Sequence, residues 1–472
     1  MLLINPCYPN RGFLPPIGLA YIGSILERLG MKAEIIDCLV TKDYRKRIKG
    51  YLNNHSTVGI SAGIGNISSA LDIASMIRHC FPKTRVIFGG PHSTAIYHKL
   101  IPEYADIVVL GEGEDTITEL MQEGDLSKIK GIAYQENGSV KANPRRPFIE
   151  DLDRLPIPAW HLLDLNKYRF GSARLPLASI LTSRGCPYRC IYCTKFIHGY
   201  KIRLRSIENV LVEIDYLVKK QGIKEIYIAD DNFTFYPERI KRFSRMIIEK
   251  KYKDIRFSAG NGIRADIGDF EMFKLLRQAG FYSVSFGVET GSQEVSDKLK
   301  RGLQLSQVKE RIEIAKKAGM KVTLDILVGS PFDVMETTCK TVDFARSLCA
   351  HNVSFNMAVP FPGTEFYQMI EEKGRFLYDL KMNTADIFGK ATYEIGDLKA
   401  KDFERMYKKA HQRYYFRLRP FQIWAVLNYK IYCFGTILGL LRYAWGIIGA
   451  IFFNEGRIKK VKIRQRIILI QK

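Results

Sequence analysis

The chain has 472 residues with a net charge of +23, and 46% of its residues are hydrophobic while 26% are charged. This length and composition suit two or three folded domains and exclude a disordered chain. Nine cysteines over this length do not form a secreted disulfide framework, and the first residues are too few for the apolar core of a signal peptide. We therefore expect a reducing, cytoplasmic compartment.

The first 126 residues alternate short apolar strands with helices. Hydrophobic spacing predicts helices over 18–29 and 69–79, and strands over 2–5, 33–36, 58–62, 86–88 and 107–110. This repetition is typical of an α/β domain with a doubly wound parallel sheet, whose ligands bind at the carboxyl ends of the strands. No G-x-G-x-x-G follows the first strand, so a nicotinamide or flavin site is not supported.

Residues 127–175 are rich in proline and are interpreted as a connecting segment. The alternation resumes over 176–390, where strands are expected at 177–182, 225–229, 255–259, 282–287, 322–327 and 353–358. Six such units predict an open, partial (βα)6 barrel with its functional groups on the loops after the strands. Residues 391–472 are expected to form a helical C-terminal extension.

Three cysteines stand close together directly after the first strand of this second unit. Cys186, Cys190 and Cys193 follow a C-x3-C-x2-C spacing, which supplies three thiolates and not four. A structural zinc site takes four ligands, and iron–sulfur clusters also take four cysteines as a rule. The run therefore favours a cluster with one iron left open. The alternatives are a chance cluster of cysteines and a three-cysteine zinc knuckle completed by a distant ligand such as His198.

The cysteine run resembles the cluster loop of the radical S-adenosylmethionine (SAM) enzymes. That resemblance implies a [4Fe–4S] cluster on Cys186, Cys190 and Cys193, whose open iron binds the amino and carboxylate groups of SAM. It further implies reductive cleavage of SAM to a 5′-deoxyadenosyl radical, with an electron donor such as flavodoxin or ferredoxin. Tyr192, just before the last cysteine, is expected beside the adenine.

Polar groups and glycine at the later strand ends suit the rest of SAM. Asp231 and Asn232 offer oxygens to its amino group, and Arg264 a guanidinium that can pair with its carboxylate in bidentate fashion. Glu289 is expected at the ribose hydroxyls, and Gly329 where the backbone meets adenine. Taken singly, each also fits an ordinary turn, strand end or solvated side chain.

The first domain resembles the cobalamin-binding domain that precedes the radical domain in one branch of this family. The matching pieces are 15–22, 59–61, 89–92 and 111–116, and the resemblance places the corrin over their loops. The implied contacts are Pro16, Gly18, Ser61, Gly89, Gly90, Gly111 and Glu112. No histidine has the D-x-H-x-x-G context of a lower cobalt ligand, which predicts cobalt without one. The alternative is a domain that keeps the fold and binds no corrinoid.

The last residues are basic and apolar. Residues 401–472 hold 16 Lys/Arg against 3 Asp/Glu, a net of 16 − 3 = +13, and 421–453 are mostly apolar. A spanning helix over 431–453 would bury Arg442 near its middle, at a cost of about 2.5–3.5 kcal/mol. The pattern favours peripheral contact with the inner face of the membrane, and nucleic acid is not expected as a partner. The alternative is a helical cap on the barrel.

These observations predict an enzyme that uses an iron–sulfur cluster, SAM and cobalamin. The first hypothesis is methylation of an unactivated carbon on a small-molecule substrate that is hydrophobic or lipid-linked. The second keeps the cofactors but closes or contracts a ring, or oxidises its substrate. A third, of another class, is a non-catalytic corrinoid- or lipid-binding protein. The open three-cysteine site argues against the third hypothesis.

Overall fold

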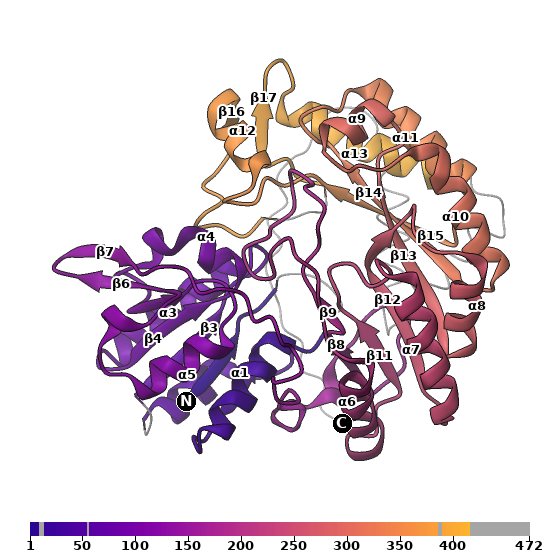
Figure 1. Ribbon diagram of the computed structural model, residues 1–472. Helices are drawn as coiled ribbons and strands as arrows, with labels where there is room; N and C mark the ends of the chain where they lie inside the picture. Colours follow the sequence, from indigo (N-terminus) through magenta and orange to yellow (C-terminus); the bar gives the residue numbers. More distant parts are fainter. Residues whose placement is uncertain (9–13, 54–55, 386–388, 416–472) are drawn as a thin grey trace, which may run out of the picture.

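Two α/β units lie side by side in the computed structural model, which describes residues 1–8, 14–53, 56–385 and 389–415 (Figure 1). The first unit is built around a seven-stranded sheet with strand order β2-β1-β3-β4-β5-β6-β7. Its elements are β1 (Leu2–Asn5), α1 (Ile17–Arg28), β2 (Glu34–Asp37), α2 (Tyr44–Leu52), β3 (Thr57–Ser61), α3 (Ile67–Cys80), β4 (Arg85–Gly89), α4 (Pro91–Leu100), β5 (Ile107–Val109), α5 (Glu114–Gln122), β6 (Ile132–Glu136) and β7 (Ser139–Ala142). The strands β1 to β5 are parallel, which confirms the doubly wound sheet predicted from the sequence.

The sheet of the first unit extends past residue 126, where the sequence analysis placed the domain boundary. β6 and β7 form a hairpin that pairs antiparallel with β5, within the segment interpreted as a connection. The hairpin turns at Asn137 and Gly138, both with positive φ. Asn-Gly between two short strands is a strong hairpin signal, so the sequence held the information that was missed.

The second unit is an open parallel sheet of six strands, in the order β15-β14-β13-β12-β11-β8. Its elements are β8 (Leu177–Ile180), β9 (Ser183–Arg184), β10 (Arg203–Leu204), α6 (Ile207–Lys220), β11 (Glu225–Ile228), α7 (Pro237–Lys250), β12 (Arg256–Arg264), α8 (Phe270–Gln278), β13 (Phe281–Glu289), α9 (Gln293–Lys298), α10 (Leu305–Lys317), β14 (Lys321–Val328), α11 (Met335–Ser347) and β15 (Asn352–Met357). The partial barrel is confirmed, and each predicted strand appears within a few residues of its expected place.

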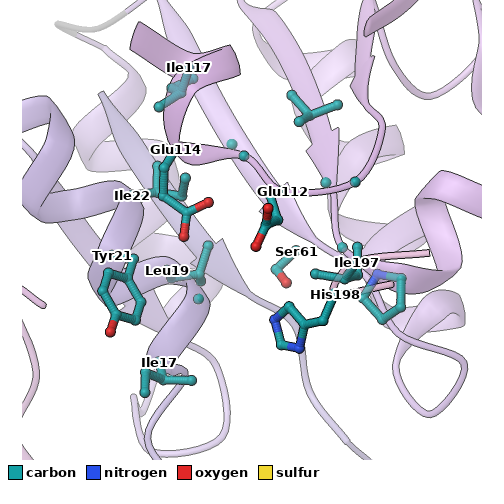
Figure 2. Close-up of a pocket in the computed structure, with 18 of the residues that line it drawn as sticks. Ile17, Leu19, Tyr21, Ile22, Ser61, Glu112, Glu114, Ile117, Ile197 and His198 are labelled. Carbon is teal, nitrogen blue, oxygen red and sulfur yellow. The ribbon is translucent and has the colours of Figure 1, made fainter. Parts of the chain in front are cut away.

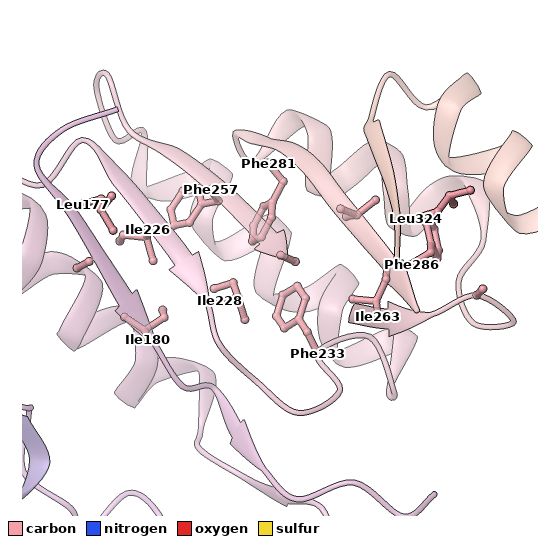
Figure 3. Close-up of a cluster of buried hydrophobic side chains, with 14 of the residues drawn as sticks. Leu177, Ile180, Ile226, Ile228, Phe233, Phe257, Ile263, Phe281, Phe286 and Leu324 are labelled. Carbon is pink, nitrogen blue, oxygen red and sulfur yellow. The ribbon is translucent and has the colours of Figure 1, made fainter. Parts of the chain in front are cut away.

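One face of the six-stranded sheet is apolar and packs on the helices around it (Figure 3). Phe257 and Phe281, on neighbouring strands, stack with their ring centres 5.0 Å apart, and both side chains are fully buried. Burial of each such side chain contributes about 1.5–3 kcal/mol, so this face holds the sheet and helices together. Side-chain caps fix two of the helix starts: Ser206 accepts a hydrogen bond from Asn209 N, and Asp269 from Met272 N.

The chain after β15 packs on both units. It comprises α12 (Glu365–Lys373), the antiparallel pair β16 (Gly374–Phe376) and β17 (Tyr393–Ile395), and α13 (Ala400–Tyr415). α13 lies against β15, where Tyr415 Oη donates to Val353 O at 2.8 Å. The segment before residue 386 crosses to the first unit, where His92 Nε2 lies 2.9 Å from Lys381 O. Among the helices of the described residues, none combines the length and apolar character that crossing a membrane requires.

Candidate functional site

The three cysteines lie on one loop between β9 and β10, two short strands that follow β8 and pair antiparallel with each other. Cys186 is buried, Cys190 is half-buried and Cys193 is exposed. Gly185 has φ +93°, and a Cβ there would collide with the carbonyl of Lys201, so the loop needs glycine at this point. Within the described part of the chain, no three His, Cys, Asp or Glu side chains converge as they would around a single metal ion.

Two aspartates after β11, a buried Asp230 and a half-buried Asp231, hold the start of this loop. Asp230 accepts hydrogen bonds from Thr182 N, Thr182 Oγ1 and Ser183 Oγ, each at 2.6 Å. Asp231 accepts from Gly185 N at 2.9 Å and lies 2.9 Å from His198 Nδ1. Burial alone would raise the pKa of Asp231, but the hydrogen bond and charge of His198 lower it to about 2. The His198 ring is therefore engaged by Asp231. The three cysteines predicted as cluster ligands and His198, the alternative zinc ligand, lie on the same loop.

A buried arginine that the sequence analysis missed lies beside the cysteines. Arg301 Nη1 donates to Tyr192 Oη at 2.6 Å and lies 3.6 Å from Glu289 Oε1 and 4.0 Å from Cys190 Sγ. Arg301 also donates to the carbonyl of Gly287. It belongs to a run of lysine and arginine that reads as a solvated surface, and only the fold brings it to the cysteine loop.

Glu289 reaches Arg301 because the end of β13 is irregular. The register with β14 shifts between Gly287 and Glu289, and Glu289 has φ +65°. A left-handed backbone at a residue other than glycine costs on the order of 1–3 kcal/mol and is concentrated at functional sites. Burial raises the pKa of the Glu289 carboxyl, while the Arg301 charge opposes that rise.

Arg264, predicted to pair with the SAM carboxylate, is bonded within the protein. Arg264 directs its guanidinium at Asp266, at 2.9 and 2.5 Å, and at the carbonyls of Arg301 and Gly302, at 2.5 and 2.8 Å. In the structure it therefore holds the loop that carries Arg301, and its pairing with the SAM carboxylate stays a prediction.

Asn232 has the properties of a ligand-facing position, whereas Gly329 is packed against the side chains of Met357 and Phe403. Asn232 is 4% exposed, and neither atom of its amide has a hydrogen-bond partner among the described residues. Buried amides are satisfied as a rule, so these two orphaned atoms fit a bound polar group. Gly329 has φ +78°, and a Cβ there would approach Met357 Sδ to 3.0 Å. A side chain at Gly329 is therefore strained and crowded.

A cavity of about 440 Å³ lies between the first sheet and the cysteine loop (Figure 2). The first unit lines it with the strand ends of β3, β4 and β5 and with α1, and the second unit with residues of the cysteine loop. Pro16, one of the seven predicted cobalamin contacts, does not line this cavity. The other six do: Gly18, Ser61, Gly89, Gly90, Gly111 and Glu112. Thr194, Lys195, Ile197, His198 and Asp231 line the opposite side.

The strand ends at this cavity are shaped for close approach to a ligand. Gly90 has φ +103°, and a Cβ there would lie 2.8 Å from Ala62 O, so no side chain fits. Deeper in, the wall is apolar, with Leu3, Leu19 and Ile117 among its members. A few polar groups over an apolar wall are typical of cofactor sites. The residues present therefore fit a corrin, which the glycine-rich strand ends and this apolar wall would hold.

A buried ion network joins this cavity to the cysteine loop. Arg184, next to Gly185, donates to Glu112 at 2.9 Å and to Glu114 at 2.6 Å, and Arg203 lies 2.9 Å from both oxygens of Glu112. All four side chains are at most 7% exposed. Glu112, predicted from the sequence as a cobalamin contact, thus also holds the cysteine loop. Because two arginines balance two carboxylates, removing any one of the four leaves the buried network with a net charge.

A titratable carboxyl lies on the other face of the six-stranded sheet. Asp325 on β14 accepts a hydrogen bond from Ser285 Oγ at 2.5 Å. Burial raises the pKa of Asp325 to about 7; the Ser285 hydrogen bond opposes the rise, and the neighbouring Glu289 charge adds to it.

The raised pKa of Asp325 predicts a pH-dependent stability. In the unfolded chain this carboxyl titrates near 3.8, so its contribution to folding is greatest below that pH and is lost as pH rises towards 7. The free energy of unfolding of Asp325→Asn minus that of the wild type should therefore increase by about 2–3 kcal/mol from pH 5 to pH 8. Urea unfolding at both pH values, with the exposed Glu310→Gln as control, measures this. Equal differences at the two pH values would contradict the shift.

Comparisons with known proteins match both α/β units of the chain. The radical SAM superfamily model matches residues 180–345, and the B12 binding domain model matches residues 10–121. The uncharacterized methyltransferase PH0819 of Pyrococcus horikoshii is 32% identical over 75% of this chain and 78% of its own length. The anaerobic magnesium-protoporphyrin IX monomethyl ester cyclase of Rubrivivax gelatinosus is 27% identical over 79% and 70%.

Solved structures share the fold over most of the chain. The cobalamin-dependent S-adenosylmethionine radical enzyme OxsB, with aqua-cobalamin and SAM bound, superposes with a TM-score of 0.72 at 17% identity, covering 95% of this chain and 74% of its own. The radical SAM methyltransferase TsrM from Kitasatospora setae superposes with a TM-score of 0.65 at 21% identity, covering 79% and 77%.

Proposed function

Because this chain belongs to the cobalamin-dependent radical SAM enzymes, we propose that it is a methyltransferase acting on an unactivated carbon. Its cofactors are a [4Fe–4S] cluster, SAM and cobalamin. The observation that carries the proposal is the 440 Å³ cavity, which lies between the glycine-rich strand ends of the first unit and the cysteine loop of the second. A methyl carrier in this cavity would lie next to the site at which SAM is cleaved.

The chain's own residues have separable tasks in this proposal. Cys186, Cys190 and Cys193 hold the cluster and leave one iron free for SAM. Arg301 replaces Arg264 as the proposed partner of the SAM carboxylate, because its donors lie beside Cys190, and Glu289 keeps its expected place at the ribose hydroxyls. Tyr192 and Gly329 bracket the adenine. When bound, the cluster and SAM supply a radical that removes hydrogen from the substrate, and cobalamin supplies the methyl group.

A second candidate keeps these cofactors and changes the outcome. The cyclase of Rubrivivax gelatinosus, at 27% identity over most of the chain, favours radical ring closure or oxidation as the alternative. The electron for either reaction would come from a donor such as flavodoxin or ferredoxin. A non-catalytic role as a corrinoid- or lipid-binding protein has no comparable support, because the chain is a radical SAM enzyme.

The test of the proposal follows the methyl group of SAM. The anaerobically reconstituted full-length protein is incubated with cobalamin, a reductant, SAM bearing a trideuterated methyl group and fractionated cell extract. We expect a product heavier by the labelled methyl group together with 5′-deoxyadenosine. A product that is oxidised or cyclised without the label would contradict methyl transfer and favour the second candidate.

Arg301→Met should weaken SAM binding and destabilise the protein. The substitution removes the donors beside Cys190 and leaves the half-buried Glu289 without its cation. A hydrogen bond to a charged group is worth about 1.5–3 kcal/mol, so we expect the affinity for SAM to fall about tenfold to hundredfold. Equilibrium binding of SAM to the cluster-loaded protein measures this. Glu249→Gln, on the far end of α7, is the control, and unchanged affinity in Arg301→Met would refute the assignment.

Membrane contact remains a proposal because residues 416–472, with the predicted apolar stretch 421–453, lie outside the described residues. The charge of +13 over 401–472 should bring the protein to anionic vesicles, at about 1 kcal/mol for each Lys or Arg near the surface. Removing 421–472 should abolish co-sedimentation with these vesicles and leave SAM cleavage intact. Failure of the full-length protein to bind vesicles, together with misfolding of the truncated one, would identify the segment as a cap on the barrel.

A further inference from the structure

The inner face of the six-stranded sheet is polar and partly open, in contrast to its helix-facing side. Along β14 and β15 every second residue is fully buried, and the residues between them are half-buried or exposed. The half-buried ones on this face of β13, β14 and β15 are mainly hydroxyl, amide and carboxyl groups: Ser283, Thr323, Asp325, Asn352, Ser354 and Asn356. A packed barrel core would bury apolar side chains at these positions, so this face is built to meet something polar.

Asp325 lies in the middle of this face. In the register of the sheet, Gly287 of β13 is its partner on one side and Ser354 of β15 on the other. Neither Gly287 nor Gly262 on β12 carries a side chain, and a Cβ on Gly262 would come only within 3.9 Å of Asp325 Oδ2. Room in front of this carboxyl therefore lies on the side of Gly262, whereas Glu289 Oε1 and Arg301 Nη2 occupy the space over Gly287, 3.2 and 3.6 Å from where its Cβ would be.

Asp325 is also the carboxyl of this region that lacks a cation. Glu225 lies 3.2 Å from Arg256, and Glu289 lies 3.6 Å from Arg301. Among the salt bridges of the described residues none includes Asp325, whose hydrogen bond comes from the neutral hydroxyl of Ser285. An enclosed carboxylate is costly unless it gains a partner charge, and the pKa of about 7 reflects that cost.

We propose that Asp325 is a specificity-determining residue that binds a protonated amine of the substrate. The inference rests on the proposed methyl transfer and names the chemical class of its substrate: a polar molecule whose basic nitrogen supplies the charge that Asp325 lacks. The hydroxyl and amide groups of β14 and β15 would bind the rest of its polar surface. Since Glu289 and Arg301 influence Asp325 electrostatically, the amine would lie close to the proposed SAM site.

The experiment separates candidate substrates by charge. Cell extract is divided into cationic, neutral, anionic and lipid pools, and each pool is incubated with the holoenzyme and trideuteromethyl SAM. We expect labelled product from the cationic pool alone. Treating that pool with acetic anhydride, which neutralises amines, should lower the labelled product about tenfold or more, because a hydrogen bond to a charged group is lost.

Two variants test the role of the carboxyl itself. Asp325→Asn keeps the shape and removes the charge, so we expect labelled product from the cationic pool to fall about tenfold or more. Asp325→Glu, which keeps the charge, should retain more product than Asp325→Asn. Glu310→Gln, exposed on α10, is the control and should match wild type.

The outcomes distinguish this inference from the function on which it rests. Labelled product from the lipid, anionic or neutral pool, or full labelling by Asp325→Asn, overturns the amine assignment and leaves methyl transfer intact. The lipid pool would be the active one if the substrate is hydrophobic or lipid-linked. No labelled product from any pool, with 5′-deoxyadenosine still formed, overturns methyl transfer and with it the inference.

Discussion

Replacing Cys186, Cys190 and Cys193 together with alanine is expected to abolish both iron–sulfur cluster binding and reductive cleavage of SAM. The three thiolates are the cluster ligands in the proposed site, and the part of the chain that the structure describes holds no group of three His, Cys, Asp or Glu side chains that could replace them. Anaerobic reconstitution should yield one [4Fe–4S] cluster in the wild type, measured by iron and sulfide content and absorbance, and none in the triple variant. Production of 5′-deoxyadenosine should fall to background.

The control for this loss is a cysteine of similar exposure elsewhere. Cys80, at the end of α3, is exposed like Cys193 but lies in the first unit, away from the loop. Cys80→Ala should keep the full cluster content and the wild-type rate of SAM cleavage. Cleavage that survives the triple substitution would refute the cluster assignment, and equal loss in Cys80→Ala would point to general instability.

Filling the cavity is expected to block cobalamin without disturbing the fold. Gly18 lines the cavity, and a Cβ there would have no atom within 4 Å, so Gly18→Trp adds an indole with little local clash. Overpacking a formed site costs about 1–3 kcal/mol, which corresponds to about tenfold to hundredfold weaker binding of cobalamin. Gly50→Trp, on the far side at α2, also has a free Cβ position and should bind normally.

The bound cobalt provides a second readout of the same site. The sequence predicts no histidine ligand, so electron paramagnetic resonance of the Co(II) state should lack nitrogen superhyperfine splitting. His198 lines the cavity, but its Nδ1 is engaged with Asp231. A clear axial nitrogen signal, lost on His198→Ala, would identify that imidazole as the ligand and contradict the prediction. Unchanged cobalamin affinity in Gly18→Trp would place the corrin elsewhere.

The sequence predicted the fold closely because its signals are local. Strand and helix periodicity placed the two sheets and most of their elements to within a few residues. The cysteine spacing and the glycine-rich strand ends are likewise contiguous motifs, and six of the seven predicted cobalamin contacts line one cavity. The hairpin at Asn137 and Gly138 was missed although its signal was local, because the surrounding prolines favoured a connecting segment.

The rest of the site depends on contacts between distant residues. Arg301 reaches Cys190 across 111 positions of the chain, and Arg184 reaches Glu112 across 72. No periodicity marks such residues: Arg301 belongs to a short basic run typical of a surface, and Arg184 is an isolated charge between a strand and the cysteines. Arg264 shows the converse limit: its position after β12 suggested a ligand contact, and the fold uses its donors for Asp266 and two backbone carbonyls.

The buried ion network has a consequence for how this enzyme can be recombined. Glu112 and Glu114 belong to the first unit, whereas Arg184 and Arg203 flank the cysteine loop of the second. A chimera that takes the first unit from a relative must therefore inherit both acids, or replace all four residues at once. The two units are separate in the sequence, but residues up to Arg203 have to be exchanged together. The crossover point of a chimera therefore lies after Arg203 and not at the domain junction.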